Sequence, residues 1–176
     1  MSLHRALWVL LMTVLPVAAT VQPRPEDVLK SAVVVSFLRY TRWPGGESAP
    51  IRVGVIGRRE FAVALRRLLE GKSDGKRPYR LHELHSREEG RSCHLVYVAA
   101  GKDAEMRSAL AALVHTGPLI MGEDNRFLDF GGDVNLFLVD GRVGFEFRRS
   151  IATAARFTIS SRLLRFGQAR GCKGAF

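Results

Sequence analysis

The sequence predicts an α/β domain: a single layered sandwich with a mainly parallel sheet, a C-terminal β-hairpin and a closing helix. Short β-branched runs alternate with segments whose apolar residues recur at helical spacing, a pattern typical of parallel sheets crossed by helices. Near the end of the chain, two strand-like runs flank Asp140 and Gly141, a dipeptide typical of tight hairpin turns. The composition is 47% hydrophobic and 25% charged, which fits an ordinary globular domain.

The first predicted helix covers residues 26–42. It begins after Pro25 with two acidic residues, as the helix dipole favours, and it ends at Trp43 because Pro44 follows. Its apolar positions form a surface wider than packing against one sheet requires. The helix is therefore either deeply buried or offers part of its surface to a partner.

The middle of the chain alternates between strand and helix patterns. The run IRVGVIG at residues 51–57 is β-branched and follows Pro50, as expected for a buried strand. The segment after it carries leucines at helical spacing. By the same reasoning we expect further strands at residues 79–84, 93–99 and 118–121, and helices at residues 58–69 and 103–115.

The end of the chain is predicted to form a hairpin and a last helix. The hairpin strands are residues 134–139 and 143–147. Ser150 can cap the helix, which ends near Gly167, and residues 168–176 are expected to fray. Apolar residues recur at i+4 spacing along this helix: Ile151, Ala155, Ile159 and Leu163. Repeats and linkers are not evident, so one domain is expected at residues 20–176, with its core at about 26–167.

Residues 1–19 have the pattern of a secretory signal peptide. His4 and Arg5 give a positive start, an apolar run follows at residues 6–17, and small residues end it at the spacing of a cleavage site. The apolar run is shorter than the roughly 20 residues that a membrane-spanning helix needs. We therefore expect cleavage and export, and no later segment long enough to span a membrane.

The chain is strongly basic, with a formal net charge of +10. Removal of the signal peptide, which carries one arginine and no acids, leaves +9. The basic residues are dispersed as pairs, and an exported protein does not meet nucleic acid, so nucleic-acid binding is not expected. A solvated basic surface and a specific anion site remain as alternatives.

Two cysteines, Cys93 and Cys172, are present, and export would place them where disulfides persist. The sequence is compatible with a Cys93–Cys172 disulfide and also with two free thiols. A CxxC motif is absent, so the sequence gives no support for a thioredoxin-like redox role.

The sequence does not assemble a catalytic or metal site. The glycines of the turn at residues 54–59 do not match the spacing of a dinucleotide-binding fingerprint. His82, His85 and His94 lack the spacing that fixes metal ligands on one face. Serine and cysteine nucleophiles lack a base at a recognisable spacing. We therefore predict a non-enzymatic protein with no cofactor and no metal.

A long loop at residues 121–132 is the strongest candidate for a binding feature. It follows a predicted strand end, where α/β proteins bind ligands and partners, and it contains two aromatic residues that the sequence suggests are exposed, Phe127 and Phe130. The alternative is that these two side chains cover the edge of the sheet before the hairpin.

The order of these blocks resembles the YfiR-like family of exported bacterial proteins, over about residues 28–166. The resemblance is carried by FLRYTRWP at the end of the first helix, by IRVGVIG and CHLVYVA, and by the run from Gly131 through Leu164. Each block is weak alone, but their order and spacing make the match specific.

The resemblance implies a small, dimer-forming α/β protein of the periplasm without catalytic activity. Its type member represses an inner-membrane diguanylate cyclase by binding the periplasmic part of that enzyme, which controls cyclic-di-GMP. On this basis we expect the first helix and the long loop to bind the partner, through Tyr40, Trp43, Phe127, Leu128 and Phe130. A periplasmic solute-binding protein, with a small ligand at the strand ends, is the alternative.

The chain departs from the type member at the cysteines. The type member has a disulfide around its Gly-Gly loop, near the positions of Leu128 and Asn135 here, and this chain lacks both of those cysteines. Cys93 matches a family cysteine, but the upstream partner expected on the preceding strand is missing. The loop is therefore expected to hold its shape without that crosslink.

Overall fold

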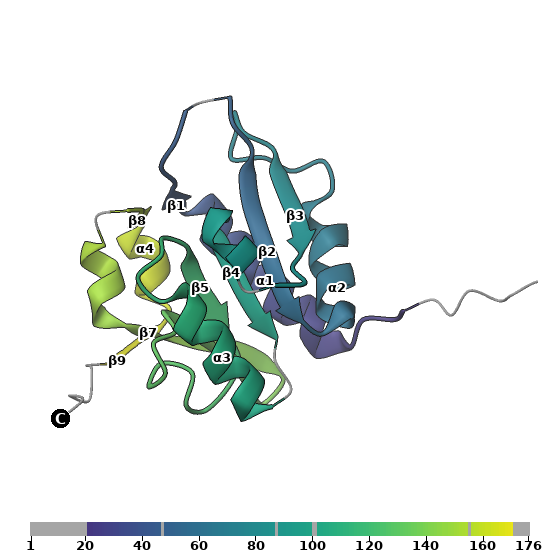
Figure 1. The fold of residues 1–176 in the computed structure, drawn as a ribbon, viewed down its shortest axis with the longest axis vertical. Helices are drawn as coiled ribbons and strands as arrows, with labels where there is room; N and C mark the ends of the chain where they lie inside the picture. The colour runs from purple at the N-terminus through teal and green to yellow at the C-terminus, as the bar shows by residue number, and fades with distance from the viewer. Residues whose placement is uncertain (1–20, 47, 87, 100–101, 155, 171–176) are drawn as a thin grey trace, which may run out of the picture.

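The computed structural model describes residues 21–46, 48–86, 88–99, 102–154 and 156–170. The proposed signal peptide and Cys172 lie outside these residues. Figure 1 shows a mixed α/β fold in which helices lie on both sides of one large sheet. None of the helices in the described part of the chain is long and apolar enough to cross a membrane.

The helices and strands follow the predicted alternation through the first two thirds of the chain. Their order is α1 (Pro25–Arg39), β1 (Thr41–Arg42), β2 (Ile51–Gly57), α2 (Arg59–Leu69), β3 (Tyr79–Glu83), η1 (Glu88–Ser92), β4 (Leu95–Ala99), α3 (Asp103–Leu113) and β5 (Leu119–Gly122). The remaining elements are β6 (Val134–Val139), β7 (Arg142–Arg148), η2 (Arg149–Thr153), β8 (Thr158–Ile159), α4 (Ser161–Leu164) and β9 (Gln168–Arg170).

The main sheet has seven strands in the order β3-β2-β4-β5-β6-β7-β9. All of its pairings are parallel except that of β6 with β7, so the prediction of a mainly parallel sheet is confirmed. Two short strands, β1 and β8, pair separately and antiparallel. This small pairing ties the end of α1 to the C-terminal part of the chain.

Side chains that alternate along the strands form two cores, one on each face of the sheet. Along β4, Leu95 and Tyr97 belong to the core under α1 and α2, whereas Val96 and Val98 belong to the core under α3. This alternation follows from the two-residue period of a strand that is covered on both faces. The fold is therefore a three-layer sandwich.

The C-terminal hairpin is confirmed. β6 and β7 pair antiparallel, with Val139 opposite Arg142. Asp140 and Gly141, between them, have φ angles of 49° and 73°. Positive φ at both central residues is what a type I′ turn requires, and it explains why an Asp-Gly pair stands there.

The long closing helix predicted after Ser150 is wrong. The segment instead forms η2, β8 and the one-turn helix α4, which is capped by Ser160. Ile151, Ile159 and Leu163 are buried as their spacing predicts, but each belongs to a different element. Residues Gln168–Arg170, expected to fray, form β9 on the edge of the sheet beside β7.

The first helix is also shorter than predicted. It ends at Arg39, with Tyr40 as its C-cap, because Thr41 and Arg42 leave the helix to pair with β8. The β-branched side chain of Thr41 suits this extended conformation.

Candidate functional site

The outer face of α1 carries an apolar patch. Val28, Leu29 and Tyr40 have exposed fractions of 44%, 45% and 50%, and Val33 is half-buried between them. Leu29, Val33 and Tyr40 recur at spacings that place them on one stripe of a helix. We call Val28, Leu29, Val33 and Tyr40 the α1 patch. Six large apolar side chains of the described residues are exposed, and three belong to this patch.

Trp43, predicted beside Tyr40 as a binding residue, faces inward. It is buried, and its indole Nε1 donates a hydrogen bond to the carbonyl oxygen of Leu38 at 3.0 Å. Its ring lies edge-on to His94, with 6.2 Å between ring centroids, and it also contacts Phe157. Trp43 therefore anchors the end of α1 to the core and supports the position of Tyr40.

The expectation that Phe127 is exposed on the long loop is wrong. Phe127 is fully buried and packs with the core under α3. Its ring fits between Gly122 and Gly132: a Cβ atom added to either glycine would lie 2.2 Å from the ring. The glycines are thus required by the close approach of the ring. The side chain therefore packs against the end of β5 within the core under α3.

The other two predicted loop residues differ in exposure. Leu128 is buried in the same core as Phe127. Phe130 is half-buried, and the guanidinium groups of Arg126 and Arg107 lie 4.5 and 5.5 Å from its ring centroid, as in cation–π contacts. Phe130 lies on the α3 side of the sheet, whereas the α1 patch lies on the other. The structure therefore does not bring the predicted binding residues into one surface.

Asp133 stabilises the end of this loop through hydrogen bonds. Its carboxylate accepts hydrogen bonds from the backbone nitrogen of Ile120 at 2.9 Å and from Arg148 at 2.8 Å. Arg148 also donates to the carbonyl oxygen of Gly131. Burial raises the pKa of Asp133 above its ordinary value, although these two partners oppose the shift. The ion pair and the buried Phe127 hold the loop in place without a disulfide between described residues.

A buried network of charged side chains lies where β2 and β4 end. β3 lies beyond β2 and β5 beyond β4, so the chain leaves these two central strands in opposite directions. The crevice at such a point is where open α/β sheets bind ligands. Arg58 follows β2, and its backbone nitrogen donates to the carbonyl oxygen of Ala99 at the end of β4 at 3.2 Å.

Charged side chains of the protein itself occupy this crevice. Asp27 of α1 is fully buried, and its carboxylate lies 3.0 Å from the guanidinium of Arg58. Glu123, which follows β5, pairs with Arg58 and also with Lys30 of α1. Burial by itself would lower the pKa of Arg58, but the carboxylates of Glu123 and Asp27 raise it above its ordinary value. Arg58 and Lys30 are therefore already paired with carboxylates of the protein itself, which disfavours the binding of a small ligand at the strand ends.

Sequence reasoning missed this network. In the sequence, Asp27 is one of two acids at a helix start, and Glu123 lies within the long loop at residues 121–132. The one available signal was that charged residues interrupt the apolar pattern of the first helix at Asp27 and Lys30. Their partners lie far along the chain, so the sequence does not indicate the pairing.

The polar residues considered for chemistry lie apart from one another. His82 and His85 are exposed, and His94 is half-buried, its Nδ1 accepting a hydrogen bond from the backbone nitrogen of Arg52 at 3.0 Å. Within the described ranges, no three His, Cys, Asp or Glu side chains are placed to hold a metal ion. Cys93 is buried and is not in a disulfide with any described residue. Its possible partner, Cys172, lies outside these residues, so a disulfide and two free thiols both remain as alternatives.

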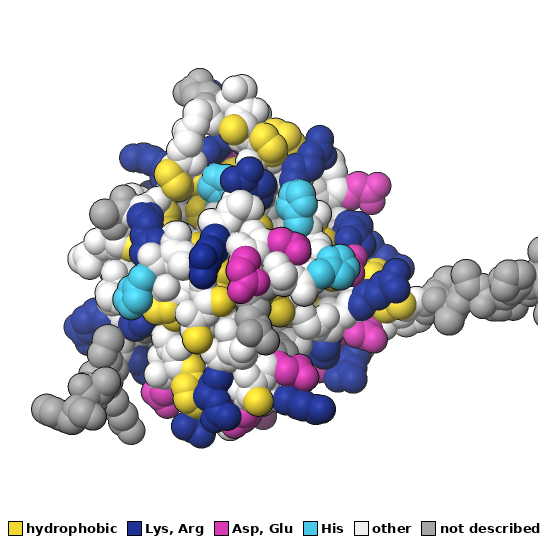
Figure 2. Space-filling view, in the orientation of Figure 1, with side chains coloured by type: hydrophobic (Ala, Val, Ile, Leu, Met, Phe, Trp, Pro, Cys, Tyr) yellow, Lys and Arg dark blue, Asp and Glu magenta, His cyan; other side chains and the backbone are white. Residues whose placement is uncertain are grey.

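Basic side chains are dispersed over the face of the molecule that α3 covers. Figure 2 shows the face that α3 covers, where Lys and Arg side chains are separated by acidic and neutral ones and do not form one tract. This distribution agrees with the dispersed basic pairs of the sequence.

Comparison with known proteins identifies the family of the chain. A family model described as YfiR/HmsC-like matches residues 27–168, which is most of the sequence and nearly all of the folded domain. A search of curated proteins finds no match. The matched region contains the α1 patch, the long loop and the charged network of Arg58. The chain belongs to the YfiR/HmsC-like family.

Proposed function

We propose that this protein is a non-enzymatic periplasmic regulator that binds the periplasmic part of an inner-membrane diguanylate cyclase and restrains it. The family regulates diguanylate cyclases, so membership fits a regulatory role. Export through the signal-peptide pattern of residues 1–19 would bring the protein to such a partner.

The observation that carries the proposal is the α1 patch. Large apolar side chains that stay exposed on one stripe of a helix are typical of surfaces that bind other proteins. The patch is also rigidly placed. Lys30 and Asp27 hold one end of α1 through the network around Arg58, and Trp43 anchors the other end in the core. Such a surface can bind a partner with little loss of conformational entropy.

Phe130 is a second and separate surface. Because it lies on the opposite side of the sheet from the α1 patch, one flat partner surface could not contact both. We propose the α1 patch as the primary contact with the cyclase. Phe130, between Arg107 and Arg126, is a surface for further contacts.

The experiment compares two patch variants, Leu29→Glu and Tyr40→Glu, with a matched control, Val139→Glu. Val139 is 55% exposed at the end of the hairpin, so its substitution adds the same charge to an equally exposed apolar side chain. Tagged full-length protein is used to recover the cyclase from detergent-solubilised membranes, and cellular cyclic-di-GMP is measured in parallel. We expect recovery to fall about tenfold or more for the patch variants, and cyclic-di-GMP to rise.

Two results would contradict the proposal. Equal recovery by the patch variants and by wild type, at unchanged thermal stability, would remove the α1 patch as the contact. The resemblance also implies a homodimer, so the same variants are examined by light scattering. If they dissociate a dimer while cyclase recovery stays intact, the patch serves self-association instead of the cyclase.

A further inference from the structure

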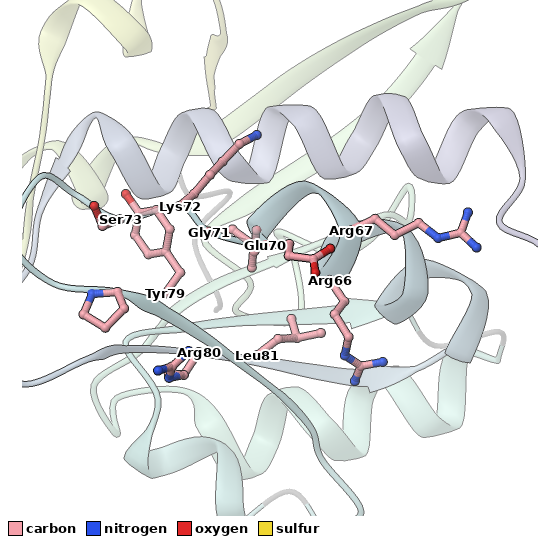
Figure 3. Close-up of a pocket in the computed structure, with 11 residues that line it drawn as sticks. Arg66, Arg67, Glu70, Gly71, Lys72, Ser73, Tyr79, Arg80 and Leu81 are labelled. Carbon is pink, nitrogen blue, oxygen red and sulfur yellow. The ribbon is translucent and has the colours of Figure 1, made fainter.

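The surface between the end of α2 and the edge strand β3 has a hollow of about 550 Å³. A second hollow of about 530 Å³ adjoins it below the end of α1. Lys72, Ser73 and Tyr79 line both. Figure 3 shows the hydroxyl ends of Ser73 and Tyr79 near each other at one end of the first hollow, whereas the side chain of Lys72 extends away from them toward α1. A hollow of this size accommodates a small organic molecule.

Tyr79 presents an unused hydrogen-bonding group at this junction. The residue is only 4% exposed and packs in the core under α1 and α2. Its hydroxyl is buried and has no hydrogen-bond partner among the described residues. Burial raises the pKa of Tyr79, so the hydroxyl keeps its proton and can donate it. An unsatisfied buried hydroxyl costs free energy that a bound acceptor would recover.

The side chains around the junction supply an excess of positive charge. Arg67, Lys72 and Arg80 line the first hollow and Arg39 lines the second. These four cations make no ion pair with any described residue, whereas Arg66 is already paired with Glu83. Two charged side chains of the second hollow act on the hydroxyl of Tyr79 in opposite directions: the carboxylate of Asp74 raises its pKa, and the guanidinium of Arg39 lowers it by less.

The walls also carry two carboxylates, which reduce this excess of positive charge. Asp74 lines the second hollow but is held by Arg77, with 3.0 Å between guanidinium and carboxylate, and by the backbone nitrogens of Lys76 and Arg77. These contacts keep the pKa of Asp74 low although burial opposes them. Glu70 is the other acidic residue of the walls. Ser73 accepts a hydrogen bond from the backbone nitrogen of Gly75 at 3.2 Å, which leaves its own hydroxyl proton available.

We propose that the junction of the two hollows binds the phosphate group of a small phosphorylated molecule. Lys72 and Arg39 would supply charge, and Tyr79 and Ser73 would donate hydrogen bonds. Positive side chains combined with neutral hydroxyl donors suit a phosphate, which has several strong acceptor oxygens. Leu69, Pro78 and Leu81 give the first hollow an apolar wall for the rest of the molecule. This phosphate site does not depend on the proposed contact between the α1 patch and the cyclase.

The test titrates the purified full-length protein with inorganic phosphate and with glycerol 3-phosphate, at constant ionic strength, by calorimetry. Tyr79→Phe removes only the hydroxyl, and Lys72→Gln removes one charge. The matched control is Arg142→Gln, which removes one exposed charge at the start of β7, away from both hollows. Vesicles of phosphatidylglycerol, compared with vesicles of phosphatidylcholine, test whether the phosphate belongs to a lipid headgroup.

We expect saturable binding that Tyr79→Phe and Lys72→Gln each weaken by about tenfold and that Arg142→Gln leaves within about twofold. Binding of phosphatidylglycerol vesicles alone, with the same sensitivity to the two variants, would support the site and assign it to a headgroup. Absence of binding to every probe would overturn the proposal. An equal loss in Arg142→Gln would also overturn it, because it would show attraction by net charge only.

Discussion

The guanidinium of Arg58 lies 3.0 Å from the carboxylate of Asp27, which is fully buried. This contact joins the first turn of α1 to the start of α2. Glu123 pairs with the same guanidinium and adds the loop after β5 to the junction. Three segments that are distant in the sequence are thus fixed to one side chain, and the orientation of the α1 patch depends on it.

Replacing Arg58 by methionine should destabilise the fold strongly. The change leaves the buried carboxylate of Asp27 without its cation, and breaking a buried pair typically costs about 3–5 kcal/mol. We expect a loss of this order in the free energy of unfolding, measured by urea denaturation. Arg59→Met is the control, because Arg59 is exposed and has no ion pair with a described residue, and it should change stability by less than about 0.5 kcal/mol. Similar losses in both variants would show that the network is not stabilising.

A methyl group at Gly132 should disturb the ring of Phe127. The added Cβ would lie 2.2 Å from the ring, so the side chain or the loop must move, and overpacking of this kind costs about 1–3 kcal/mol. Gly46→Ala is the matched control, since no atom lies within 4 Å of a Cβ there. If the clash is the cause, adding Phe127→Leu to Gly132→Ala should recover part of the loss in thermal unfolding. No recovery in the double variant would place the cause in the backbone.

The stability of the protein should decrease as the pH falls from neutral to about 5. Burial lowers the pKa of His94 below its ordinary value, and the charges of Arg52 and Arg77 lower it further. The unfolded histidine binds its proton near pH 6.5. The contribution of His94 is therefore full above that pH and is lost as the pH falls through the lower, folded-state pKa. For one proton, the slope is at most about 1.4 kcal/mol per pH unit.

His94→Gln tests this dependence, because glutamine can still accept the hydrogen bond from the backbone of Arg52. Its free energy of unfolding should vary less between pH 7.5 and 5 than that of wild type. His85→Gln, at an exposed position, should keep the wild-type slope. The contribution of Asp133 to stability depends on pH in the opposite direction, because its pKa is raised in the folded protein. This contribution is full below pH 3.8 and is lost as the pH rises through the folded-state pKa. Identical slopes in wild type and His94→Gln would exclude His94 as the source.

The thiol of Cys93 should react slowly in the folded protein. It is buried, and burial is the main reason that its pKa is raised, so little thiolate is exposed at neutral pH. In a Cys172→Ser variant, which removes the possible disulfide, we expect iodoacetamide to label Cys93 at least about tenfold more slowly in buffer than in urea. Equal rates would show that the segment around Cys93 opens readily. Mass spectrometry of the unreduced wild type distinguishes a Cys93–Cys172 disulfide from two free thiols.

Patterns confined to a few neighbouring residues were sufficient to predict most of the sheet. The run of residues 51–57 is a strand whose β-branched side chains Ile51, Val53 and Val55 are buried on one face, and the Asp140–Gly141 turn is determined by backbone conformation alone. Both features depend on residues that are adjacent in the sequence, so they can be predicted from the sequence alone. The alternation of strands and helices then fixes a mainly parallel sheet.

The errors arise where distant residues decide the outcome. The i+4 spacing of Ile151, Ile159 and Leu163 correctly predicted burial, but pairing of Thr41 with Ile159 replaced the helix by a strand. Phe127 could not be placed from the sequence, because its burial depends on two glycines that lie on either side of the loop. In the candidate site, the exposure of Tyr40 was predictable from the width of the apolar helix surface, whereas the burial of Trp43 was not.

The pairing of β1 with β8 also affects the order in which the molecule can be assembled. The backbone nitrogen of Ser160 donates to the carbonyl oxygen of Tyr40 at 2.8 Å, across most of the length of the chain. During synthesis, the first helix emerges long before the strand that secures its end. The exposed tyrosine can reach its final place only after nearly the whole polypeptide has been made. A chain truncated before Thr158 would therefore lack this anchor for the end of the α1 patch.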